Sequence, residues 1–114
     1  MLSIPELIKQ TCQSVRRIEA STAFSEMREN NGLMIDVREP GEVAAQSADG
    51  TINIPRGVLE MKIADVCKDA DAPIYLHCAS GGRAALAAKQ LQKLGYTNVT
   101  AISCSIDDIC RTQN

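Results

Sequence analysis

The N-terminal apolar residues recur at helical intervals on one face of the segment. Ser3 and Glu6 stand in front of them with the spacing of a capping box, so a short amphipathic helix is predicted here. A single apolar stripe normally serves the chain's own core. Packing across one end of the domain is therefore favoured over a dimer-forming arm. The stripe consists of Ile4, Leu7, Ile8 and Cys12.

Three further helices are predicted from capping and stop signals. Ser21 or Thr22 can cap a helix that residues 30–32, Asn-Asn-Gly, bring to an end. Pro40 can open a short helix, since proline suits the first helical position. Residues 83–94 are rich in Ala, Leu, Lys and Gln and lead to a glycine where a left-handed C-cap residue belongs.

Short apolar runs of strand length alternate with these helices. Residues 33–37 and 74–77 are continuous runs, which suit strands buried on both faces. Residues 15–19, 51–55 and 99–102 are predicted as the other strands. The alternation predicts an α/β fold with a mostly parallel sheet and helices on both faces. Ligands of such folds lie beyond the carboxyl ends of the strands, so the loop after His77 is the place to seek chemistry.

Composition narrows the class of protein. The chain has 114 residues, 45% of them hydrophobic, a formal charge of −2 and no apolar run of transmembrane length, which predicts one soluble domain that binds neither nucleic acid nor membrane. Its five cysteines form an odd set without CxxC spacing, and no secretory signal opens the sequence, so a reducing cytoplasm is expected. One histidine and scattered cysteines predict no metal site.

The predicted active loop is Cys78-Ala79-Ser80-Gly81-Gly82-Arg83. A helix N-terminus beside an arginine favours the reactive thiolate of Cys78. Paired glycines let successive N–H groups turn toward one point and form an anion cradle, and small residues at 79 and 80 leave it open. Such a cradle suits an anionic substrate or a persulfide.

Arg83 of the loop and three residues near it each have two interpretations. Arg83 either orients an oxyanion or ties the loop to a carboxylate such as Asp36 or Glu42. Strand alternation turns His77 away from Cys78, so a structural histidine is favoured over a general base. Asp36 and Arg38 are interpreted as a scaffold pair at a strand end, rather than as direct substrate contacts.

Three motifs together resemble the rhodanese-like family: Ile35-Asp36-Val37-Arg38-Glu39, Gly50-Thr51-Ile52-Asn53-Ile54-Pro55 and the loop from Cys78 to Arg83. The resemblance covers roughly residues 17–110, and its detail is similar to single-domain thiosulfate sulfurtransferases, whose loop reads Cys-x-x-Gly-x-Arg. It divides the chain into an N-terminal helical extension at 1–16 and a rhodanese-like domain at 17–114. It also implies a five-stranded parallel sheet flanked by helices on both faces.

The activity implied by the resemblance is sulfur transfer through a Cys78 persulfide, without a cofactor. Cys78 would take the outer sulfur of thiosulfate or another sulfane donor and pass it to cyanide, a thiol or a protein acceptor. A persulfide carrier that docks a partner protein and a regulatory domain without catalysis stay open as alternatives. Related phosphatases have a loop one residue longer, and the four residues between Cys78 and Arg83 fit a sulfur atom better than a phosphoryl group.

The sequence departs from the family pattern in two regions. Gln46, Ser47 and Asp49 replace the usual glycine, histidine and proline before the third strand, which concerns loop conformation more than catalysis. Near the C-terminus, Cys104 and Ile109 replace a frequent glycine and tryptophan. Cys104 could resolve the persulfide or relay sulfur. A cysteine that fills a core gap is favoured instead for Cys104 and likewise for Cys12, Cys67 and Cys110.

Overall fold

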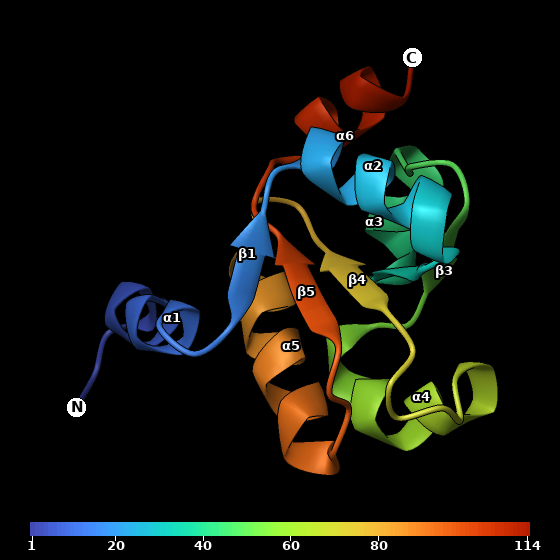
Figure 1. The fold of residues 1–114 in the computed structure, drawn as a ribbon. Coiled ribbons are helices and arrows are strands. Elements are labelled where there is room, and N and C mark those ends of the chain that lie inside the picture. The colour runs from blue at the N-terminus through green and yellow to red at the C-terminus, as the bar shows by residue number, and fades with distance from the viewer.

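A single five-stranded parallel sheet forms the centre of the computed structural model, which describes residues 1–114. The strands are β1 (Arg16–Ile18), β2 (Leu33–Asp36), β3 (Thr51–Asn53), β4 (Ile74–His77) and β5 (Val99–Ile102), in the order β1-β5-β4-β2-β3. Every neighbouring pair is parallel, as Figure 1 shows for β1, β5 and β4. The predicted five-stranded α/β fold is confirmed.

Helices cover both faces of this sheet (Figure 1). On one face, α5 packs against β4 and β5 and also contacts α1 and α4. On the other face, α2 packs against α6. A short 3₁₀ turn, η1 (Arg56–Val58), leads into α4. The helices are α1 (Ile4–Cys12), α2 (Ala20–Asn30), α3 (Pro40–Ala45), α4 (Leu59–Val66), α5 (Gly82–Leu94) and α6 (Ile106–Gln113).

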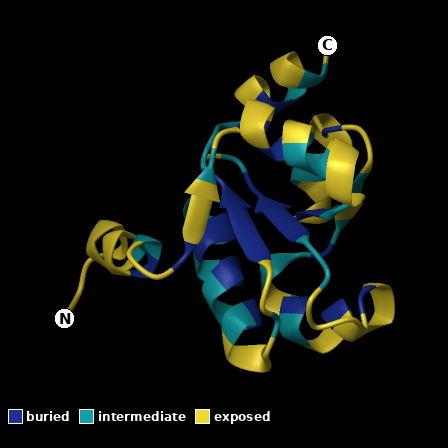
Figure 2. Ribbon diagram, in the orientation of Figure 1, coloured by how far each residue is buried: buried dark blue, intermediate teal, exposed yellow.

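Strand alternation divides the core into two apolar clusters, one on each face of the sheet. Ile35 and Leu76 belong to the cluster under α5, whereas Met34 and Tyr75 belong to the cluster under α2 and α6. The central strands β4 and β5 are buried throughout, while β1 is an exposed edge (Figure 2). This two-sided burial explains why the central strands are continuous apolar runs in the sequence.

The start of α2 and the presence of α6 differ from the sequence-based predictions. α2 begins at Ala20 with Glu19 at the N-cap position and no side-chain cap, so the proposed Ser21 or Thr22 cap was wrong. Burial of Ala20 and Ala23 against the sheet replaces the missing cap as the anchor. No helix was predicted after 102, yet Ser105 caps α6 and Ile109 is fully buried in the core position where the family often has tryptophan.

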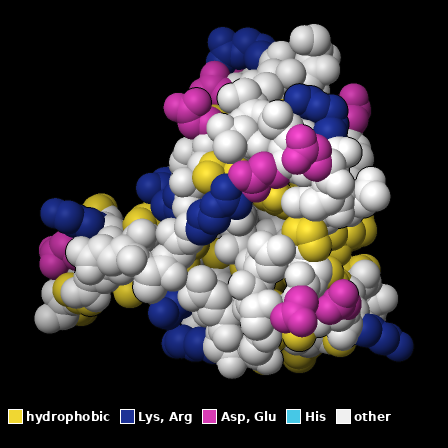
Figure 3. All heavy atoms as spheres, in the orientation of Figure 1, with side chains coloured by type: hydrophobic (Ala, Val, Ile, Leu, Met, Phe, Trp, Pro, Cys, Tyr) yellow, Lys and Arg dark blue, Asp and Glu magenta, His cyan; other side chains and the backbone are white.

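The N-terminal helix α1 forms as predicted, with the Ser3 side chain accepting the Glu6 N–H. It lies beside β1 and extends away from the rest of the molecule (Figure 1). Only part of its apolar stripe packs on α5, since Ile4 is 64% exposed and Leu7 is 37% exposed. Figure 3 shows hydrophobic side chains among the charged ones on this extension. No helix of the structure is both long and apolar enough to cross a membrane.

Candidate active site

The loop of residues 78–83 connects the carboxyl end of β4 to the first turn of α5. Cys78 follows His77 and belongs to the core cluster under α5, with only 1% of its surface exposed. Ser80 is exposed and Ala79 is half-buried, so the loop reaches the surface within two residues of Cys78. The loop thus holds the thiol at the edge of the sheet where parallel α/β folds bind ligands.

Two backbone amides of the loop converge on the Cys78 sulfur. The Gly81 N–H donates to Sγ at 3.0 Å, and the Ala84 N–H donates to it at 3.4 Å. Both amides belong to the beginning of α5, whose first N–H groups have no partner within the helix. Amide donors and the positive end of the helix both stabilise negative charge on sulfur.

The structure disfavours a side chain at Gly81 and at Gly82 for different reasons. Gly81 has a φ of 100°, in the left-handed region, and a Cβ there would lie 3.1 Å from the carbonyl oxygen of Ser103. Gly82 already belongs to α5, and a Cβ on it would lie 3.0 Å from Cδ1 of Ile8 in α1. Only the first glycine therefore serves the turn itself, and the second allows α1 to pack closely.

Arg83 forms an ion pair with Glu42 in α3. Nη1 donates to Oε1 at 2.7 Å and Nη2 to Oε2 at 2.9 Å, so both carboxylate oxygens are engaged. The arginine and the backbone N–H of Glu39 hold the pKa of Glu42 at about 2, well below its usual range. The same hydrogen bonds to Glu42 raise the pKa of Arg83 above its ordinary value. Of the two carboxylates considered in the sequence, Glu42 pairs with Arg83 and Asp36 does not.

Asp36 and Arg38 form a buried ion pair on the neighbouring strand end. Arg38 Nη2 donates to Asp36 Oδ2 at 2.7 Å, and the two side chains are 3% and 0% exposed. The same Nη2 donates to the carbonyl of Gln46 at 2.6 Å, at the end of α3. This pair therefore secures α3, the helix that carries the Glu42 partner of Arg83. Neither side chain reaches the surface of the loop.

His77 lies on the opposite face of the sheet from Cys78 and is fully buried. Its Nε2 lies 3.0 Å from Thr51 Oγ1, whereas Nδ1 has no hydrogen-bond partner and lies 4.0 Å from Asp36 Oδ2. Burial lowers the pKa of His77, against the opposing influence of Asp36. The neutral ring is thus a core group with one satisfied nitrogen, and it is turned away from Cys78.

The other four cysteines are free thiols, and only Cys67 among them is buried. Cys104 is half-buried, and its sulfur accepts the N–H of Ala20 at the start of α2 at 3.3 Å. It packs against the cluster under α2 and α6, whereas Cys78 belongs to the cluster under α5. This contact does not direct the Cys104 sulfur toward Cys78.

Arg17 is a residue near the loop that sequence reasoning missed. It belongs to the edge strand β1, is exposed, and its Nη2 lies 3.4 Å from the position that a Cβ on Gly81 would take. Its only signal in the sequence is an arginine on an edge strand. The strand order, which puts β1 beside β5, is needed to bring it to the loop.

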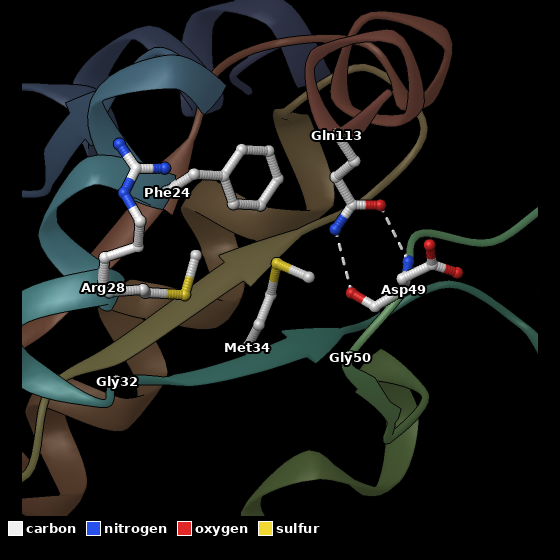
Figure 4. A pocket seen from close by; sticks show the side chains of 8 residues that line it. Phe24, Arg28, Gly32, Met34, Asp49, Gly50 and Gln113 are labelled. Atoms are coloured by element: carbon white, nitrogen blue, oxygen red, sulfur yellow. Dashed lines mark hydrogen bonds between the residues drawn. The ribbon is translucent and has the colours of Figure 1, made fainter.

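A cavity of about 290 Å³, drawn in Figure 4, lies on the face of the sheet that carries Met34, opposite the face with Cys78. Phe24 and Met34 line it on the apolar side, and Gln113 bridges the backbone of Asp49 at its rim. None of residues 78–83 contributes to its lining. The cavity is therefore separate from the loop of residues 78–83.

The sequence was compared with models of known protein families. A model described as the rhodanese-like domain matches residues 20–112. The chain belongs to the rhodanese-like family. The match includes the loop with Cys78, the Glu42–Arg83 pair and the Asp36–Arg38 pair.

Family members of known function include sulfurtransferases. The thiosulfate sulfurtransferase PspE of Escherichia coli is 32% identical over 65 residues, which are 57% of this chain and 62% of PspE. The matched regions span 51% to 62% of the length of the curated bacterial relatives. The polysulfide-sulfur transferase homodimer of Wolinella succinogenes superimposes with a TM-score of 0.80 at 25% identity, covering 94% of this chain and 81% of that one.

A further structural neighbour shares the fold alone. It is a Rhodopseudomonas palustris protein of unknown function described as a possible tyrosine phosphatase, with a TM-score of 0.84 at 22% identity, covering all of this chain and 93% of that chain. Fold does not decide function, so the chemistry must be argued from the loop.

Proposed function

We propose that this chain is a rhodanese-type sulfurtransferase that carries a sulfane sulfur as a persulfide on Cys78. The Cys78 thiolate attacks the outer sulfur of thiosulfate, the S–S bond of the donor breaks, and sulfite leaves with the electron pair. Cyanide or a thiolate then attacks the outer sulfur of the persulfide. Thiocyanate or a new persulfide leaves and the Cys78 thiolate is restored, which is covalent catalysis in two half-reactions.

The observation that carries this proposal is the pair of amide donors aimed at the Cys78 sulfur. The Gly81 and Ala84 N–H groups stabilise a thiolate before the attack. After the attack, the same end of α5 offers positive potential to the terminal sulfur of the persulfide. The chain's own backbone therefore supplies charge stabilisation in both states of the cysteine.

Arg83 acts in this proposal as a positioning residue. Its bidentate pair with Glu42 ties the first turn of α5 to α3, which Arg38 and Asp36 secure in turn. A guanidinium held in this way is not free to enclose a phosphoryl group at the sulfur. Phosphatase activity is therefore disfavoured, and hydrolysis of p-nitrophenyl phosphate at a rate requiring Cys78 would contradict the proposal.

The test is intact-protein mass spectrometry after brief exposure to thiosulfate without reductant. Wild type is expected to gain one sulfur atom, to lose it on addition of cyanide, and to release thiocyanate. Cys78→Ser is expected to gain nothing, whereas Cys67→Ser, a matched change of another buried thiol, is expected to load like wild type. Failure of wild type to load from thiosulfate, polysulfide or any persulfide would overturn the proposal.

A second candidate is delivery of the persulfide sulfur to a partner protein. A groove of about 400 Å³ between α1 and α5 has Leu7 and Leu86 in its lining and Lys89 and Lys93 among its polar residues. No acidic residue lines it, although the chain is net negative. The lysines complement an acidic protein segment, and the leucines complement an apolar side chain on that segment.

This candidate is tested with two cysteine-containing acceptor peptides, one flanked by Asp and Leu and the other by Lys and Leu. Loaded wild type is expected to transfer sulfur faster to the acidic peptide. The Lys89→Glu/Lys93→Glu double variant should lose that preference and still transfer sulfur to cyanide. Equal rates with both peptides in wild type would exclude this groove as the acceptor site.

A further inference from the structure

Arg17 has an exposed guanidinium that lies at the active loop. Its register partner is Ala101 on β5, which belongs to the cluster under α5, so the Arg17 side chain is on the same face of the sheet as Cys78. Its Nη2 is 3.4 Å from where a Cβ on Gly81 would stand. Gly81 is also the residue whose N–H donates to the Cys78 sulfur.

All other arginines except Arg28 form an ion pair with an acidic side chain, and Arg28 donates only to the hydroxyl of Ser25. Arg83, the arginine of the loop itself, is neutralised by Glu42, and Arg38 by Asp36. Arg17 alone among the arginines has neither a hydrogen bond nor an ion pair, whereas the partnered ones are Arg16, Arg28, Arg38, Arg56, Arg83 and Arg111. The free cation at the loop is therefore Arg17.

We infer that Arg17 binds the oxyanion end of the sulfur donor while the donor's outer sulfur meets Cys78. This inference rests on the proposed sulfur transfer and assigns the residue that selects anionic donors. When Cys78 attacks thiosulfate, the electron pair of the broken S–S bond moves to the departing sulfite. A guanidinium beside those oxygens stabilises both the bound donor and the leaving group.

The same chemistry recognises a carboxylate, so two donor classes fit. A thiosulfate donor presents sulfonate oxygens, and a persulfide of glutathione presents carboxylates. In the second case the outer sulfur passes to Cys78 and glutathione leaves as the thiol. The persulfide of 2-mercaptoethanol has the same reacting group without a carboxylate and serves as the matched donor.

The first experiment measures the rate of Cys78 persulfide formation against donor concentration. Arg17→Gln is expected to lower the second-order rate constant for thiosulfate about fivefold, the magnitude of one exposed charge pair. Arg17→Lys, which keeps the charge, should recover part of the loss. Arg28→Gln is the control. Arg28 is also exposed and has no acidic partner, but it lies on the other face of the sheet. Loading of Arg17→Gln within twofold of wild type for both thiosulfate and glutathione persulfide would overturn the inference.

Donor identity follows from the same variants. A loss for thiosulfate alone assigns the sulfonate, and a loss for glutathione persulfide alone assigns the carboxylate. A loss for both assigns a general oxyanion site. The 2-mercaptoethanol persulfide should load all variants equally, and an equal loss with this donor would contradict direct anion binding.

Alkylation of Cys78 separates this inference from the proposed function, because it needs no sulfur transfer. Peptide mass spectrometry measures the rates with anionic iodoacetate and uncharged iodoacetamide. Their ratio cancels any change in thiolate population, and it should fall in Arg17→Gln and remain unchanged in Arg28→Gln. If wild type takes sulfur from no donor but this ratio falls, the anion site stands and the sulfurtransferase proposal fails. If wild type loads but neither this ratio nor the rate of loading from thiosulfate falls in Arg17→Gln, the anion site fails.

Discussion

Arg83 and Glu42 join the active loop to α3 through two parallel hydrogen bonds, at 2.7 and 2.9 Å. Their residues are 41 positions apart in the sequence. Because the pair engages both terminal nitrogens of the guanidinium, we propose that Arg83 holds the loop and that another group recognises the anion. Arg17 is placed to serve that second purpose.

Replacing Glu42 tests the contribution of this pair to stability and its pH dependence. Glu42→Gln is expected to lower the urea midpoint at neutral pH. The pKa of Glu42 in the folded chain is about 2, below its ordinary value of 4.5, so the stabilisation is present above pH 4.5 and is lost as the pH falls toward 2. Urea titrations of both proteins across this range should therefore converge at low pH. Glu29→Gln, an exposed acid of α2, should match wild type throughout.

Gly81→Ala is expected to destabilise the chain and slow persulfide formation. The left-handed φ alone costs about 1 kcal/mol for a residue with a Cβ, and contact with the Ser103 carbonyl adds to it. Gly95 has a φ of 106° and open space where a Cβ would stand, so Gly95→Ala should show the conformational cost alone. Gly57→Ala has neither problem. Urea midpoints should fall in the order Gly57, Gly95, Gly81, and equal values for the last two would show that the Ser103 contact is harmless.

The buried ion pair of Asp36 and Arg38 should be costly to break. Asp36→Asn leaves the Arg38 guanidinium buried without its counter-charge, which is expected to cost about 3 kcal/mol of unfolding free energy. Arg111→Gln breaks an exposed pair with Asp108 and should change stability by no more than about 0.5 kcal/mol. Equilibrium urea unfolding measures both. Similar values for the two variants would contradict the scaffold role of Asp36 and Arg38.

His77 should make the chain less stable in mild acid. Its pKa in the folded chain is lowered by burial, so below the ordinary value of 6.5 the unfolded chain binds the extra proton more readily. His77 therefore does not lower the free energy of unfolding above pH 6.5, and it lowers this free energy progressively as the pH decreases below that value. Urea midpoints of wild type should fall more steeply between pH 7 and 5 than those of His77→Gln, which keeps a side chain able to bond Thr51. Parallel slopes would show that His77 is not the group responsible.

Local signals in the sequence predicted most elements because each signal acts within a few residues. Ser3 caps α1, Gly95 ends α5 with a left-handed C-cap, and apolar runs mark β2 and β4. The failures occur where tertiary burial replaces a local signal. α2 begins at Ala20 without a side-chain cap, since packing against the sheet anchors it.

Neighbouring residues were enough to predict the α/β class, the loop with its cysteine and the family, because a strand, a glycine turn and a helix are each encoded locally. Which charges meet depends on the three-dimensional fold. It paired Arg83 with Glu42, buried Asp36 with Arg38 away from the thiol, and brought Arg17 from an edge strand to Gly81. The physical reason is that an ion pair or anion site depends on distances of a few ångströms between residues far apart in the chain. Only strand order and helix packing set those distances.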